Sequence, residues 1–266
     1  MAYEDIIELT FPDYWYEDLA GYTMPSALLP LSGPDLVALS SVDPAFRARR
    51  GLQSLMPLSE DLTRLIALEL TALKGPAFLR TSYGMAKENP FAYAPVTTLR
   101  EVEGVLRWKD TRLLRFFGER LASGDPASLF LRQWVKIAPW AEFRVFVKGR
   151  KIIGVSQYPA QMFYPQIPAN ADAIRQGIVQ LFHETMHLLP LDDVIVEVYA
   201  DPTPAGMKVH LIEMNPFLPV TDAGLFTWAR GGDFDGSFRY LTHGPSARMA
   251  TSMQRAARPD DPWYLP

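Results

Sequence analysis

The sequence predicts a two-lobed α/β protein, in which a mixed N-terminal part precedes a mostly antiparallel sheet with one long helix packed on it. Apolar residues recur at helical spacing after Ser59 and again over 111–123. Short apolar runs follow one another through tight turns between 129 and 157, as in a β meander. Two further apolar runs, 194–199 and 208–215, flank a Pro/Gly turn and predict a hairpin.

Composition narrows the function classes. The 266 residues are 48% hydrophobic and 21% charged, which is sufficient for a large core. A net charge of -4 does not favour nucleic acid or an anionic membrane as the main partner. The chain has no cysteine, so disulfides, thiolate metal sites and a cysteine nucleophile are excluded. The N-terminus lacks a signal-peptide pattern and no run is long enough for a membrane span, so we expect a soluble cytoplasmic protein.

The elements in chain order suggest a lobe boundary near 134–139. The aromatic residues near the N-terminus are expected to pack, since no basic residues alternate with them. The expected elements are a loop with short extended pieces at 25–36, a helix from Ser59 to Gly75, a strand at 76–81, helices at 99–108 and 111–123, strands at 129–137, 142–147 and 151–157, and a helix at 171–189. The tail from Pro245 is expected to be a poorly structured extension or a docking segment.

Each run of the predicted hairpin carries one glutamate among apolar residues, Glu197 and Glu213. With the turn centred near Ala205, Glu197 lies opposite Glu213, and Asn215 lies opposite Ile195. Opposed like charges destabilise a sheet, and a divalent cation would remove that cost. Two carboxylates and an amide oxygen suit Mg²⁺. The alternative is that both glutamates lie on a solvent-facing side of the sheet.

Cations near predicted strand ends form a second group of candidates. Arg80 ends a strand and Lys87 follows in a glycine-containing loop, while Arg132 and Arg144 lie within two later strands. Guanidinium and ammonium groups placed this way can bind polyphosphate oxygens, which Mg²⁺ would also contact. The alternative is that each arginine is a surface strand residue with a salt-bridge partner. Neither a P-loop nor a Rossmann glycine motif is present.

A third motif, His183-Glu184-Thr185-Met186-His187, matches the HExxH pattern of zinc peptidases. A zinc site needs a third protein ligand, and no downstream helix offers an obvious one. The surrounding helix also has an apolar face typical of packing, formed by Ile174, Ile178, Leu181, Phe182, Thr185 and Leu189. We therefore treat a zinc peptidase as a remote alternative.

Five segments in the same order resemble the ATP-grasp fold, and in particular its Cdc123 (D123) family. They are 78–80 with Lys87, 131–134, 142–147 followed by 153–157, 196–199, and 211–217 with 221–228. The resemblance covers about 76–241. It implies two α+β lobes with a nucleotide cleft between them: a divergent region at 1–75 belonging to the N-terminal lobe, the rest of that lobe with its hinge at 76–135, the C-terminal lobe at 136–244 and an extension at 245–266.

The same resemblance implies roles for individual residues. Arg80, Lys87 and Arg144 would contact the phosphates of ATP, with Arg144 and Arg80 stabilising the transferred charge. The backbone of a hinge at 131–134, which contains Arg132, Gln133 and Trp134, would read adenine. Glu197, Glu213 and Asn215 would hold Mg²⁺. The family usually has Lys at the position of Arg80, and Asp at those of Glu197 and Glu213.

Two activities are compatible with these implied roles. The main expectation is a carboxylate–amine ligase that forms an acyl-phosphate from ATP and acts on an unidentified small-molecule or peptide substrate. The alternative is an ATP-binding assembly chaperone with a protein partner and no ligase turnover.

Overall fold

The structure is a computed structural model that describes residues 3–85, 88–204 and 206–243. The chain divides into two compact units. One contains Pro25–Val135, and the other contains the described residues up to Met24 and from Lys136 onward. Within the described residues, none of the helices combines the length and the apolar character needed to cross a bilayer. The predicted tail from Pro245 lies outside these residues.

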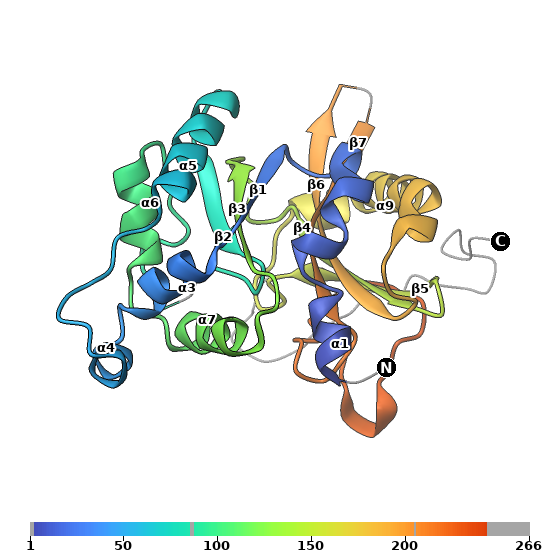
Figure 1. Ribbon diagram of the computed structural model, residues 1–266. Helices are drawn as coiled ribbons and strands as arrows, with labels where there is room; N and C mark the ends of the chain where they lie inside the picture. Colours follow the sequence, from blue (N-terminus) through green and yellow to red (C-terminus); the bar gives the residue numbers. More distant parts are fainter. Residues whose placement is uncertain (1–2, 86–87, 205, 244–266) are drawn as a thin grey trace. The chain divides into compact units, whose positions relative to one another are not determined.

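The described residues of the unit formed by Pro25–Val135 contain a three-stranded antiparallel sheet in the order β1-β3-β2 and five helices (Figure 1). The predicted helices at 111–123 and after Ser59 are confirmed, and the Ser59 hydroxyl caps the latter by accepting from the Leu62 N–H. The elements are β1 (Ser26–Pro30), α3 (Gly33–Ser40), α4 (Pro44–Arg50), α5 (Glu60–Ala72), β2 (Ala77–Thr81), α6 (Leu99–Leu106), α7 (Thr111–Ser123) and β3 (Ser128–Gln133).

The expected loop at 25–36 is only partly correct. Its extended piece is β1, but α3 begins within it at Gly33. Ser32 and Asp35 form a capping box, in which the Ser32 side chain accepts from the Asp35 N–H and the Asp35 carboxylate accepts from the Ser32 N–H. Pro34 is tolerated in the first turn because no helical hydrogen bond is needed there.

The second unit is built on a five-stranded sheet in the order β7-β6-β4-β5-β8. Its pairs are antiparallel except for β5 with β8. The elements are α1 (Tyr3–Glu8), η1 (Pro12–Tyr14), α2 (Tyr16–Leu19), η2 (Ala20–Tyr22), β4 (Glu142–Lys148), β5 (Lys151–Tyr158), α8 (Gln166–Ala169), α9 (Ala171–Thr185), η3 (Met186–Leu188), β6 (Val194–Thr203), β7 (Gly206–Pro216), η4 (Ala229–Gly231) and β8 (Phe238–Arg239).

One face of this sheet carries the main core. Val145, Val196 and Val198 are fully buried there against Ile178 and Phe182 of α9, which lies beside β7 in Figure 1. Every residue of the predicted packing face of this helix is buried. The sheet with one long helix packed on it is therefore confirmed.

The N-terminal segment also contributes to this core, although the sequence analysis placed it in the other lobe. Trp15 and Leu19 are fully buried in the same cluster. The Thr23 hydroxyl donates to the Leu211 carbonyl at 2.7 Å. Residues up to Met24 therefore group with the five-stranded sheet, because their apolar side chains are buried against it.

The opposite face of the sheet is partly covered by the loop after β7. Phe226 packs on Phe146 and Ile195, both fully buried. A Cβ at Gly154 would lie 2.5 Å from the Phe226 ring, so the loop can approach this closely only over a glycine. Beyond this aromatic cluster the same face carries charged side chains.

Candidate functional site

Four carboxylate and guanidinium side chains gather on this face of the five-stranded sheet. Strand pairing places Arg144 of β4 next to Glu197 of β6, and Glu197 next to Glu213 of β7. Glu142 lies two residues from Arg144 and therefore shares its face. The predicted register is confirmed, since Glu197 lies opposite Glu213, and Asn215 opposite Ile195.

A β-bulge at Ile212 interrupts this hairpin. Glu213 pairs with Glu197, but Leu211 pairs with Val198, so Ile212 is the extra residue on β7. Strict alternation along β7 would place Leu211 on the face of Glu213, and the bulge prevents this. Leu211 lies in the main core with Val198, while Glu213 is on the opposite face.

Arg144 is the central cation of the cluster. Its Nη2 and Nε donate to one oxygen of Glu197 at 2.7 and 2.9 Å, and its Nη1 donates to the Asp222 carbonyl at 2.6 Å. The guanidinium also lies over the Tyr158 ring, 4.1 Å from its centroid. Arg144 is thus largely buried and held in one position by three different partners.

Burial and like charge act on the glutamates in the same direction. Burial, together with the charge of Glu213, raises the pKa of Glu197 to about 8, and Arg144 opposes this shift. The pKa of Glu142 is also raised by burial and by Glu213. The direct guanidinium contact favours the ionised form of Glu197, but burial and the charge of Glu213 outweigh it, so this carboxyl takes up a proton more readily than an exposed one.

The predicted metal ligands Glu197, Glu213 and Asn215 are brought together. The Asn215 amide nitrogen donates to Glu197 at 3.2 Å and to Glu213 at 3.5 Å. Metal ligation would require the amide to present its oxygen instead. No three acidic or histidine side chains of the described residues gather as a metal site, so the set remains two carboxylates and an amide.

The charge balance of the cluster fits a divalent cation. Glu142, Glu197 and Glu213 can together carry three negative charges. Arg144 carries one positive charge; it contacts Glu197 and favours the ionised forms of Glu142 and Glu197. A surplus of buried carboxylate is costly without a further cation. Oxygen ligands of this kind suit Mg²⁺.

Two of the predicted phosphate contacts lie in the Pro25–Val135 unit. Phe78 pairs with Arg132 and Arg80 pairs with Phe130, which places both arginines on one face of the sheet. Both are buried, Arg132 at 2% exposure. Arg132 also donates to Ser26 at 3.4 Å and lies over the Phe130 ring. Lys87 lies outside the described residues.

The expected hinge differs from the structure in its hydrogen bonds. Arg132 and Gln133 belong to β3, the central strand, so their backbone groups face neighbours on both sides. The Gln133 N–H donates to the Pro25 carbonyl, and the Trp134 N–H donates to the Pro76 carbonyl. These two N–H groups are therefore already bonded within the unit, and the adenine-reading role of the backbone at 131–134 stays a prediction.

The HExxH motif does not form a continuous helical pair. Helix α9 ends at Thr185, and His187 lies in the 3-10 helix η3, which changes the spacing of the two imidazoles. Both histidines are exposed, and Glu184 accepts a hydrogen bond from Gln180. Within the described residues no third ligand completes a site.

Three residues in the cluster were not identified as site residues from the sequence: Glu142, Tyr158 and Asp222. Alternation along β4 and β5 could have indicated Glu142 and Tyr158, because these residues pair directly. Asp222 lies in the segment 221–228 that carries the family resemblance, and no site role is implied for it there. Its contact with Arg144 comes from a loop that folds back, and no local pattern reveals such a contact.

The sequence model of a family described as D123 matches residues 119–253, about half of the chain. The chain belongs to the D123 family. The match includes β4 to β8 and therefore all of the cluster described above. The expected family resemblance is confirmed.

Among curated D123-like proteins, the translation initiation factor eIF2 assembly protein of Xenopus laevis is 40% identical over 101 residues, which cover 38% of this chain and 29% of that protein. The chain thus matches less than a third of that relative. Cdc123 from Schizosaccharomyces pombe has the same fold, with 20% identity, a TM-score of 0.69, and coverage of 86% of this chain and 92% of that chain. D-alanine--D-alanine ligase from Bacillus anthracis is more distant, at 11% identity and a TM-score of 0.34, with coverage of 79% of this chain and 52% of that chain.

These findings confirm the mixed α/β class and its Cdc123-like fold, but they correct the expected activity. Several curated relatives that match, from Xenopus laevis, Danio rerio and other organisms, are named for eIF2 assembly or for the cell division cycle, and none of these names describes a ligase. The expectation of a carboxylate–amine ligase is therefore wrong, and the assembly-factor alternative is the better supported of the two.

Proposed function

We propose that this D123-family protein is an ATP- and Mg²⁺-binding assembly factor that acts on a protein partner without ligase turnover. Its partner would be a translation initiation factor of the kind named in its relatives, and its location would be the cytoplasm. The assembly role is supported by the names of the relatives. The metal part is supported by one observation, the opposed pair of buried Glu197 and half-buried Glu213 with Asn215 beside it.

The residues have distinct proposed tasks in this function. Glu197, Glu213 and Asn215 would hold Mg²⁺, which supplies charge neutralisation for the phosphates of ATP. Arg144 would keep Glu197 oriented through its 2.7 Å contact. Arg80 and Arg132 share one sheet face and would contribute positive charge toward the nucleotide, together with Lys87.

Calorimetry with ATP, with and without MgCl₂, tests the nucleotide part. We expect binding that requires Mg²⁺, is lost in Glu213→Gln and is weakened in Arg80→Met. Arg64→Met is the matched control, because Arg64 is exposed on α5 and pairs only with Asp61 among its described contacts. Equal ATP affinity in the wild type and in Glu213→Gln would contradict the proposed metal site.

A second experiment separates assembly from catalysis. The purified protein is incubated with Mg²⁺-ATP and eIF2 subunits, and both ADP release and complex formation are measured. We expect complex formation that depends on ATP, with no ADP release beyond the rate without protein. Rapid ADP release stimulated by an amine or carboxylate, without complex formation, would contradict the assembly role.

A further inference from the structure

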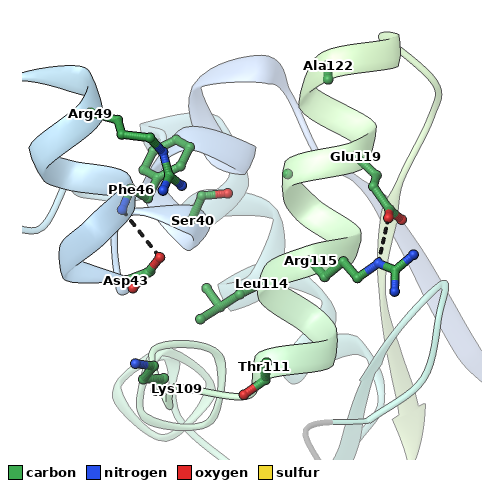
Figure 2. A pocket seen from close by; sticks show the side chains of 11 residues that line it. Ser40, Asp43, Phe46, Arg49, Lys109, Thr111, Leu114, Arg115, Glu119 and Ala122 are labelled. Carbon is green, nitrogen blue, oxygen red and sulfur yellow. Dashed lines mark hydrogen bonds and ion pairs between the residues drawn. The ribbon is translucent and has the colours of Figure 1, made fainter.

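A groove of about 560 Å³ lies in the Pro25–Val135 unit, apart from the residues assigned to ATP or Mg²⁺. Figure 2 shows helix α7 on one side of it and α4 on the other, with Ser40 at the end of α3 between them. The Ser40 hydroxyl and the Leu114 side chain both point into this space. The volume is in the range of known ligand sites.

Ser40 provides an unusual polar group in the groove. Its residue exposure is only 2%, and its hydroxyl has no hydrogen-bond partner among the described residues. The neighbouring Ser41 differs, because its hydroxyl donates to the Ala38 carbonyl and accepts from the Met56 N–H. A buried hydroxyl left without a partner costs about 1–3 kcal/mol, so a ligand that bonds to Ser40 would recover stability.

The lining of α7 indicates an elongated ligand. Thr111, Leu114, Gly118 and Ala122 line the groove at spacings of three or four residues, which is one face of the helix. At 1.5 Å per residue this face extends roughly 16 Å, the length of about five extended residues. A Cβ at Gly118 would meet no atom within 4 Å, so the groove is open at that position.

The charges of the groove favour an acidic occupant. Arg49 and Lys109 are exposed in the lining and have no ion-pair partner among the described residues. The acidic lining residues are already engaged: Asp43 accepts from the first N–H groups of α4, and Glu119 pairs with Arg115 at 2.7 Å. Two unpaired cations in a chain of net charge -4 thus mark a local positive site.

We propose that this groove binds a short acidic segment of a partner protein. An apolar side chain of the segment packs between Phe46 and Leu114, its backbone bonds to the Ser40 hydroxyl, and its carboxylates contact Arg49 and Lys109. The proposal rests on the proposed function in one respect, that the occupant is a protein. Its location and chemistry come from the groove itself.

Fluorescence anisotropy with two labelled six-residue peptides tests the groove. One peptide alternates acidic residues with Phe and Leu, and the other replaces each acidic residue by Lys. We expect the full-length protein to bind the acidic peptide and to bind the basic one at least roughly tenfold more weakly. Equal binding of both peptides, or no binding of either, would overturn the proposal.

Variants locate the binding. Gly118→Leu fills the groove and should abolish binding of the acidic peptide, while its melting temperature stays the same or rises because glycine is unfavourable inside a helix. Arg49→Glu with Lys109→Glu should weaken binding by roughly tenfold or more. Arg100→Glu, an exposed arginine outside the lining, is the control and should stay within about twofold of wild type. Undiminished binding in Gly118→Leu would place the peptide elsewhere and overturn the proposal.

Two further measurements separate the alternatives. Succinate that displaces the peptide at equal concentration would identify a small-molecule site and overturn the peptide proposal. The same groove variants should bind Mg²⁺-ATP as the wild type does. Loss of peptide binding with intact ATP binding would locate the peptide in the groove, whereas peptide binding without any ATP binding would contradict only the nucleotide function.

Discussion

Glu197 lies directly opposite Glu213 across the β6–β7 hairpin, and Arg144 contacts Glu197 at 2.7 Å from the other side. Glu197 therefore has the buried Arg144 guanidinium on one side and the half-buried Glu213 carboxyl on the other. Such an arrangement is expensive in the isolated protein and becomes favourable when a second cation binds. The stability of the protein should therefore depend on Glu213, on Arg144 and on pH.

Glu213→Gln should raise the stability of the metal-free protein by about 1 kcal/mol, because it removes the like charge opposite Glu197. The variant should also lose the increase in melting temperature that MgCl₂ gives the wild type. Differential scanning fluorimetry with and without MgCl₂ measures both effects. Glu103→Gln, on α6, is a control whose response to Mg²⁺ should match the wild type. An undiminished Mg²⁺ response in Glu213→Gln would remove Glu213 from the metal site.

Above about pH 8, where Glu197 is ionised, Arg144→Met should destabilise the protein by about 3–5 kcal/mol, since it leaves the buried Glu197 carboxylate without its cation; at lower pH the loss should be smaller. The double variant Arg144→Met with Glu197→Gln should recover a large part of this loss. Urea unfolding of the two single variants and the double variant gives the coupling free energy. If the losses of stability in the two single variants add up to the loss in the double variant, the Arg144–Glu197 contact contributes no coupling free energy.

The metal-free protein should become less stable as the pH rises. Burial and the charge of Glu213 raise the pKa of Glu197 from 4.5 to about 8, so the folded state holds the proton more tightly. The stabilising contribution of the protonated form is complete below about pH 4.5 and is lost as the pH rises toward about 8. Mg²⁺ should flatten this dependence, because it binds the ionised carboxylates. Urea unfolding midpoints measured between these pH values check this dependence. A midpoint that rises with pH in the metal-free protein would contradict the prediction.

Arg239→Gln should unfold the loop between β7 and β8 more easily, at a cost of about 2–4 kcal/mol. Arg239 is buried, donates to the Asp233 carboxylate at 2.7 Å and to the Leu225 carbonyl at 3.2 Å, and lies 3.9 Å from the Phe226 ring centroid. Hydrogen exchange of residues 222–236 measures the effect. If the amide groups of residues 222–236 exchange as slowly as in the wild type while the free energy of global unfolding falls, Arg239 stabilises the core and not this loop.

Much of the fold could be predicted because its signals are local. Helical spacing identified α7 with its bounds as observed. A turn centred near Ala205 predicted the pairing of Glu197 with Glu213, which in the structure depends on the bulge at Ile212, because Thr203 pairs with Gly206. The capping box at Ser32 was also a local signal, but it was missed amid the prolines around it. The helix expected at 171–189 is too long. In the structure α9 ends at Thr185 and the chain continues as the 3-10 helix η3 from Met186.

The candidate site could be predicted only in part, because some of its contacts depend on the tertiary fold. The two glutamates and Arg144 stood out as charges within apolar strands. Asp222 reaches Arg144 through a loop that returns over the sheet, which alternation does not show. The bonded N–H groups of Gln133 and Trp134 depend on Pro25 and Pro76, which lie far away in sequence.

The bulge at Ile212 has a consequence for comparisons within the D123 family. The extra residue in β7 shifts the alternation of side chains between the two faces of the sheet. The part of β7 before Ile212 and the part after it therefore follow separate alternating patterns. Paired insertions or deletions near the turn can therefore lengthen or shorten the hairpin without moving the carboxylates off their face. The number of residues separating the two glutamates is then a poor signature of the family, and alignments should be anchored separately on each strand.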